Sequence, residues 1–137
     1  PDFARNIINN EDIVLFSDGS PTRTFCYVAD AIVGYFKVLV KGVDGESYNI
    51  GMDKPEISIL DLAERTIEVS RKLFNYRGNL IMKSSDDKNY LTDNPNRRCP
   101  TIDKAIKDLG FNPKINLSEG LEKSLLWYFD NAIGEDL

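Results

Sequence analysis

The chain has 137 residues, of which 42% are hydrophobic and 28% are charged, values typical of a single soluble globular domain with a modest core. A net charge of −5 argues against nucleic acid as the main partner, while still allowing one phosphate group held by one or two arginines. The absence of histidine excludes Ser-His-Asp and Cys-His catalysis and the usual zinc ligands, so we expect no metal site.

Cys26 and Cys99 are the two cysteines, too few for a disulfide framework, and we interpret both as reduced thiols. No apolar run approaches the ~20 residues that a membrane span requires. We therefore expect a cytoplasmic protein with neither a membrane nor nucleic acid among its partners.

The hydrophobic pattern predicts a small mixed α/β domain with short strands and about five helices. In chain order we expect a helix over 2–10, a strand over 13–16, a turn over 17–22, an extended segment over 23–28, a helix over 29–41, a strand over 47–50, a helix over 58–73, a strand over 80–82, an irregular stretch over 84–100, and helices over 101–109 and 118–132. Ser58 and Asp61 have the spacing of a capping box, Thr101 and Ser118 are candidate caps, and Gly110 is placed to end a helix. Strands this short make a poor sheet alone but could extend a larger one.

The segment from Asp18 to Phe25 is the first candidate site. A buried strand leads into a tight turn, Gly19 allows close backbone approach, and Arg23 follows at once. An arginine presents a planar fork of donors that fits a phosphate. The alternative is a hairpin turn followed by an arginine in a surface ion pair.

The segment from Asn94 to Pro100 is the second candidate, because Arg97 and Arg98 lie between two prolines in an acidic chain. Such a local positive patch suits a phosphate, and the alternative is a solvated charge pair in a loop. Neighbouring acids such as Asp86 and Asp87 are usually solvated, so we do not expect them to be catalytic.

Two other residues favour structural roles. Asp30 lies in the first turn of its helix, where a carboxylate is favoured by the helix dipole. Cys26 lies in an apolar extended segment and is better explained as core than as a nucleophile. The whole sequence contains no G-x-G-x-x-G motif, and no tyrosine is followed four positions later by lysine.

Taken together, the motifs are similar to the C-terminal part of extended short-chain dehydrogenase/reductases that act on nucleotide sugars. The nearest groups are UDP-glucuronate decarboxylases and dTDP-glucose 4,6-dehydratases, with 4-epimerases further away. The matching segments, in register over nearly the whole chain, are Ser17–Asp30, Tyr48–Gly51, Ser58–Ala63, Asn94–Pro100, Lys104–Ala105, Leu109–Pro113 and Leu117–Phe129. Thr101 and Phe111 stand where the family often has Asp and Trp, and both substitutions look like packing variants.

The resemblance implies roles for particular residues. Arg23 would bind the nucleotide diphosphate, and Arg98 would reach the diphosphate or the ribose. The residues that would line the nucleotide pocket or close over the base are Phe16, Ser17, Asp18 and Phe3.

The resemblance also implies what this sequence lacks. Family members hold NAD in an N-terminal Rossmann domain, which also carries the tyrosine-lysine pair of the catalytic step. Residues 1–137 would then form one C-terminal domain that binds a UDP- or dTDP-sugar and does not catalyse alone. We keep three hypotheses open: a fragment of a whole enzyme, a stand-alone nucleotide-sugar-binding module, or an interaction domain. The sequence leaves open the base, the choice between decarboxylation, dehydration and epimerisation, and whether the protein is a homo-oligomer.

Overall fold

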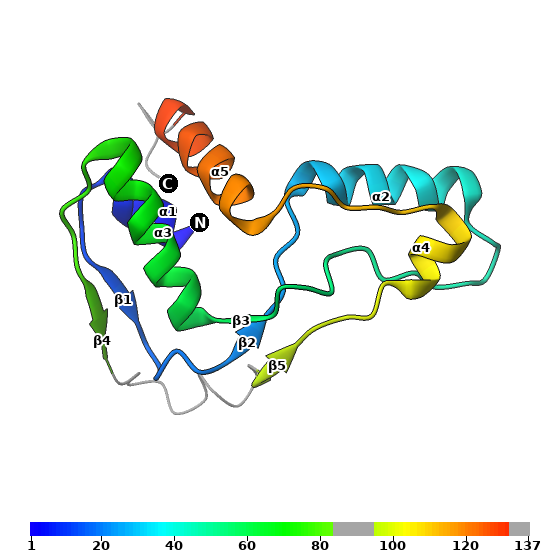
Figure 1. Cartoon of the computed structure of the whole chain (residues 1–137), viewed down its shortest axis with the longest axis horizontal. Coiled ribbons are helices and arrows are strands. Elements are labelled where there is room, and N and C mark those ends of the chain that lie inside the picture. The colour runs from blue at the N-terminus through cyan, green and yellow to red at the C-terminus, as the bar shows by residue number, and fades with distance from the viewer. Residues whose placement is uncertain (84–94, 132–137) are drawn as a thin grey trace. The chain divides into compact units, whose positions relative to one another are not determined.

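The computed structural model describes residues 1–83 and 95–131, and within them it has five helices and five short strands. This confirms the predicted mixed α/β class with about five helices. The elements in chain order (Figure 1) are α1 Asp2–Ile8, β1 Ile13–Leu15, β2 Thr22–Arg23, α2 Val28–Lys41, β3 Ile57–Ser58, α3 Ile59–Phe74, β4 Leu80–Met82, β5 Arg97–Arg98, α4 Asp103–Leu109 and α5 Leu117–Asn131. None of these helices combines the length and the apolar character that a membrane crossing demands.

The chain divides into two compact units. The first comprises Pro1–Pro21, Ser58–Asn96 and Leu121–Leu137, and the second comprises Thr22–Ile57 and Arg97–Gly120. Each unit has its own cluster of buried apolar side chains, so the single core that the length predicts is replaced by two smaller ones.

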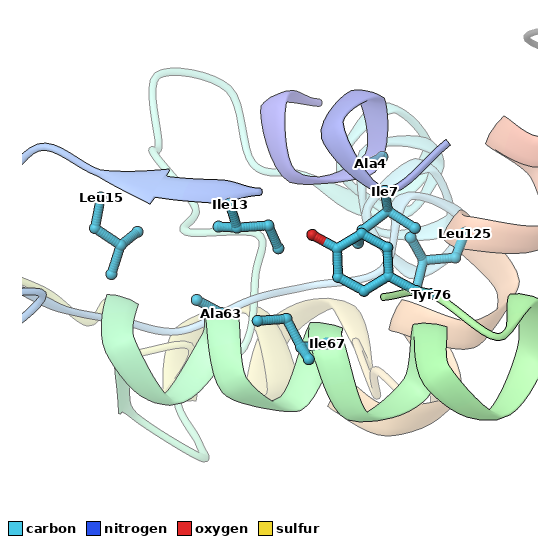
Figure 2. Close-up of a cluster of buried hydrophobic side chains, with 8 residues drawn as sticks. All are labelled: Ala4, Ile7, Ile13, Leu15, Ala63, Ile67, Tyr76 and Leu125. Atoms are coloured by element: carbon cyan, nitrogen blue, oxygen red, sulfur yellow. The ribbon is translucent and has the colours of Figure 1, made fainter. Parts of the chain in front are cut away.

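The first unit is built on the parallel pair β1–β4, in which Ile13 is opposite Leu80. Alternation along β1 sends Ile13 and Leu15 to the same side of the strand, and Figure 2 shows both directed toward α3. There they meet Ala63 and Ile67, which lie one helical turn apart on α3. The cluster is completed by residues of α1, of the segment after α3 and of α5, namely Ala4, Ile7, Tyr76 and Leu125.

The predicted capping box at the start of α3 is confirmed. Ser58 Oγ accepts a hydrogen bond from the Asp61 N–H at 2.9 Å, and the Asp61 carboxylate accepts one from the Ser58 N–H at 3.3 Å. The other end of α3 is closed by Asn75 in the left-handed region, with φ 53°. Local sequence signals therefore account for both ends of this helix.

The second unit is organised around α2 and α4. Its buried cluster contains Ile102, Ala105, Leu109 and Phe111. The Asp30 carboxylate accepts the backbone N–H groups of Lys114 at 3.0 Å and Ile115 at 2.8 Å, which supports the structural role expected for Asp30. Gly110, with φ 64°, ends α4 as predicted.

Some predicted details differ from the structure. Residues 47–50 form no strand, because no described segment pairs with them. Ile102 precedes α4 as its N-cap, while the Thr101 hydroxyl donates to the Asp103 carboxylate at 3.0 Å instead. Asn116, not Ser118, caps α5 by accepting the Glu119 N–H at 3.0 Å. Position 132, the predicted end of that helix, lies outside the described residues.

An apolar face of α2 is exposed. Leu39 is 80% exposed and Val40 is 77% exposed, whereas Gly34 is the one buried residue of this helix. The other large apolar residues of α2 that are at least half exposed, or nearly so, are Val28, Ile32, Val33, Tyr35 and Phe36. Such a face normally marks a surface that another element covers.

Candidate functional site

Arg23 and Arg98, predicted from separate segments, lie side by side in the second unit. β2 and β5 form a parallel pair in which Arg23 is opposite Arg98 and Thr22 is opposite Arg97 (Figure 1). The Thr24 N–H donates to the Arg98 carbonyl at 3.3 Å and extends the pairing. Partners in a parallel ladder share a face, and successive residues alternate between faces. Arg23 and Arg98 therefore lie on one face of the pair, and Arg97 lies on the other.

On the face of the β2–β5 pair that carries Arg97, Arg97 forms an ion pair with Glu56. Arg97 Nε donates to both carboxylate oxygens of Glu56, at 2.9 and 3.1 Å, and Arg97 Nη2 donates to one of them at 2.7 Å. The Thr22 hydroxyl donates to the same carboxylate. The hydrogen bonds from Arg97 and then from Thr22 hold the pKa of Glu56 below its ordinary value, and the bond to Glu56 raises the pKa of Arg97.

The opposite face of the β2–β5 pair carries the side chains of Arg23 and Arg98. Arg23 is half-buried and donates from Nη1 to the carbonyl of Thr22 at 2.7 Å, while Arg98 is exposed. Their Cα atoms are partners in the ladder, so the two side chains start from neighbouring positions on one face. A diphosphate, which accepts several charge-assisted hydrogen bonds, is a chemically suitable ligand for two arginine forks.

The predicted pocket residues Ser17 and Asp18 form a tight turn in the first unit. Ser17 Oγ accepts the Gly19 N–H at 3.1 Å, and the Asp18 carboxylate accepts the Ser20 N–H at 2.9 Å. The hydrogen bonds from Ser20 lower the pKa of Asp18. Gly19 has φ 70°, and a Cβ there would lie 2.8 Å from the Leu60 Cβ, so only glycine fits without rearrangement.

The two predicted aromatic residues differ in exposure. Phe3 packs, partly buried, against the hydrophobic cluster of the first unit, whereas Phe16 is 47% exposed. Their contact with a nucleotide base, and that of Ser17 and Asp18 with the pocket, stay predictions.

Other candidate chemistry finds less support. Within residues 1–83 and 95–131, no three His, Cys, Asp or Glu side chains come together as a metal site. Cys26 and Cys99 are free thiols, and burial, followed by the charge of Asp30, raises the pKa of Cys26, which disfavours a thiolate nucleophile. Asp86, Asp87 and Asn94 lie outside the described residues.

The sequence did not point to Glu56, and it gave Thr22 no role of its own within the Asp18–Phe25 segment. It also predicted an irregular stretch over Arg97 and Arg98, although they form β5. Glu56 follows a loop and precedes the capping box, and no local pattern marks it. Its role depends on residues 34 and 41 positions away, which only the folded chain brings near.

The structure defines a class of fold, a mixed α/β chain, in which two arginines are partners in one parallel ladder. Residues 1–51 match the model of the NAD dependent epimerase/dehydratase family. The chain is 32% identical over 133 residues to dTDP-D-glucose 4,6-dehydratase of Bos taurus, covering 96% of this chain and 36% of that protein. It is 32% identical over 119 residues to UDP-glucuronic acid decarboxylase 3 of Arabidopsis thaliana, covering 87% of this chain and 32% of that protein.

Among solved structures, the UDP-glucuronic acid 4-epimerase from Bacillus cereus in complex with UDP-glucuronic acid and NAD is 28% identical, with a TM-score of 0.75. The match covers 96% of this chain and 39% of the epimerase. These comparisons confirm the predicted resemblance: the chain is related to part of the extended short-chain dehydrogenases that act on nucleotide sugars. It spans about a third of the length of the curated relatives named above.

Proposed function

We propose that the chain is the C-terminal, nucleotide-sugar-binding part of an NAD-dependent epimerase, dehydratase or decarboxylase. Arg23 and Arg98 together hold the diphosphate of a UDP- or dTDP-sugar. The observation that carries this proposal is their placement opposite each other in the β2–β5 ladder, on the face away from Glu56. The relatives' names support the ligand class, because one acts on a dTDP-sugar and another is bound to UDP-glucuronic acid.

The predicted contacts of the first unit with the nucleotide rest on the family resemblance. Ser17 and Asp18 lie in a turn whose shape Gly19 fixes, and the resemblance assigns them to the nucleotide pocket. It likewise assigns Phe16 to the pocket and Phe3 to the base.

NAD and the catalytic tyrosine-lysine pair belong, on this proposal, to a Rossmann domain that works with the chain. The sequence of 137 residues has no phosphate-cradling glycine motif, so its own residues do not fit NAD. They bind and orient the sugar nucleotide and carry no chemical step. We also propose a cytoplasmic location for the chain.

The exposed face of α2 supports a docking surface for that Rossmann domain. The family match covers residues 1–51 and therefore includes all of α2. An exposed apolar helix also suits the alternative role of an interaction domain, in which another subunit covers α2.

Calorimetric titration of the chain with UDP-glucose and dTDP-glucose tests the binding function. With one wall of the sugar site absent, we expect weak binding, with a Kd of roughly millimolar. Arg23→Ala should weaken it about tenfold, because it removes a charge-assisted contact to phosphate. Arg5→Ala is the matched control, since Arg5 pairs with Asp2 at an exposed position of α1. Heat absent at several millimolar ligand, or equal affinities of wild type and Arg23→Ala, would contradict the proposal.

A further inference from the structure

We propose that Glu56 is a positioning residue that selects Arg98, rather than its neighbour Arg97, as the arginine facing the diphosphate. This inference rests on the proposed function, because it concerns how the same site is assembled. It adds a residue that neither the motifs nor the family resemblance pointed to.

The geometry places Glu56 where it can hold two strands at once. The sheet of the second unit has the order β3-β2-β5, and Glu56 immediately precedes β3. Its carboxylate accepts from Thr22 on β2 and from Arg97 on β5, so one side chain bridges the central strand to the far strand. The Glu56 side chain is 27% exposed, and the carboxylate and guanidinium meet fork to fork, which fixes direction as well as distance.

The strands themselves specify their register only weakly. β2 and β5 have two residues each, and such short strands have few ladder hydrogen bonds to resist a slip. A slip of one residue would exchange the faces of Arg97 and Arg98. These two residues are chemically identical, so nothing in their own side chains decides which one faces the ligand.

The hydrogen bonds from Thr22 and Arg97 to Glu56, which we call the Glu56 clamp, determine which arginine lies on which face. With Arg97 held at the carboxylate, Arg98 lies on the opposite face, in register with Arg23. The two guanidinium groups then reach the same ligand from adjacent strands. Glu56 does not touch the ligand, and it acts through Thr22 and Arg97.

Electrostatic repulsion alone and the positioning role predict opposite changes in ligand affinity when Glu56 is neutralised, and this makes the inference testable. A carboxylate near an anion site repels the anion, so neutralising Glu56 should strengthen binding if charge alone mattered. If Glu56 instead positions the arginines, neutralising it should weaken binding.

The test compares Glu56→Gln with Glu46→Gln in calorimetric titrations with UDP-glucose. Glu46 is a matched control, because it lies in the same unit, carries the same charge and pairs with Lys104. We expect Glu56→Gln to raise Kd about tenfold, and Glu46→Gln to leave Kd within about twofold. An unchanged or lower Kd in Glu56→Gln would overturn the inference.

A double-substitution cycle separates positioning from direct contact. If Arg97 serves only the clamp, Arg97→Gln in the Glu56→Gln background should weaken UDP-glucose binding by less than about twofold more. A further tenfold loss would show that Arg97 itself binds ligand, and would overturn the inference. Thr22→Val is the second variant, needed if Glu56→Gln does not fold. It removes the hydroxyl that donates to Glu56 but keeps the β-branched shape and the ion pair, and it should raise Kd by about threefold.

A ligand-free measurement distinguishes the failure of this inference from that of the proposed function. The Thr24 N–H is bonded to the Arg98 carbonyl, so its hydrogen exchange reports the register of β2 and β5. Exchange about fivefold faster or more in Glu56→Gln, but not in Glu46→Gln, is expected whether or not UDP-glucose binds. If wild type binds no UDP-glucose, the proposed function fails, while unchanged Thr24 exchange in Glu56→Gln contradicts the clamp itself.

Discussion

Gly34 is the one buried residue of α2, and it lies against Ile50 and Phe111 of the same unit. Replacing it with alanine gives the sharpest test of this packing. A Cβ at position 34 would lie 2.4 Å from Ile50 Cγ2 and 2.9 Å from Phe111 Cε2, well inside the ordinary carbon–carbon contact of about 3.5–4.0 Å. Phe111 is 1% exposed and cannot move outward without disturbing its buried neighbours Ala105 and Leu109. The added methyl group must therefore push α2 away or distort the cluster.

Two effects of opposite sign determine how much Gly34→Ala changes the free energy of unfolding. Overpacking costs about 1–3 kcal/mol, and replacing glycine within a helix by alanine returns up to about 1 kcal/mol. Because the closest contact is so short, we expect the upper part of the cost and a net loss of about 1–2 kcal/mol in the free energy of unfolding. For a chain of this size, that lowers the unfolding temperature by about 4–8 °C.

Gly120→Ala is the matched control, because it makes the same substitution in α5. Its Cβ would meet nothing closer than 3.6 Å, which is ordinary contact, so helix propensity alone should raise stability by up to about 1 kcal/mol. Thermal unfolding followed by circular dichroism measures both variants. A Gly34→Ala protein as stable as wild type would refute the described packing of α2 on Ile50 and Phe111.

Three further predictions concern capping, pH and the exposed helix. Ser58→Ala removes the cap of α3 and should lower stability by about 1 kcal/mol in urea denaturation, whereas Ser47→Ala, at an exposed position outside any helix or strand, should change it little. The hydrogen bonds from Ser58 lower the pKa of Asp61 in the folded chain. The ionised Asp61 carboxylate therefore stabilises the fold fully above the ordinary carboxyl pKa of about 4, and this stabilisation is lost as pH falls through the lower folded pKa. An unfolding temperature that falls equally with acid in wild type and Asp61→Asn would contradict this. Leu39→Glu on the exposed face of α2 should change stability by less than about 0.5 kcal/mol yet reduce self-association in light scattering at high concentration, and a clean monomer in wild type would argue against α2 as an interaction surface.

Local sequence signals predicted much of the fold. The capping box of Ser58 and Asp61 and the stop at Gly110 depend on residues close in sequence, and both are confirmed. The strand at 80–82 is also confirmed, and there the apolar run finds a distant partner in β1. The strand expected at 47–50 failed because a strand needs a partner, and pairing is not written in the segment itself. The apolar face of α2 was visible in the sequence, but periodicity cannot tell whether a neighbour covers it.

The candidate site was predictable only in part, for the same reason. Arg23 and Arg98 could be singled out by composition and by resemblance, whereas their pairing in one ladder is a long-range property of the fold. Glu56 carries no motif, and its partners Thr22 and Arg97 come from two other strands. Two arginines that bind a diphosphate determine neither the nucleotide base nor the reaction, because other residues would contact the base and the sugar.

The central claim is that Arg23 and Arg98 jointly hold the diphosphate of a nucleotide sugar. Nuclear magnetic resonance of the arginine Nε–H groups, recorded while UDP-glucose is added to the chain, tests it most directly. We predict that the signals of Arg23 and Arg98 shift together and saturate with one apparent Kd. Those of Arg97 and Arg5, which are held by Glu56 and Asp2, should stay in place, and uridine, which lacks phosphates, should move none of them. Shifts confined to Arg97, or equal shifts with uridine, would contradict the account.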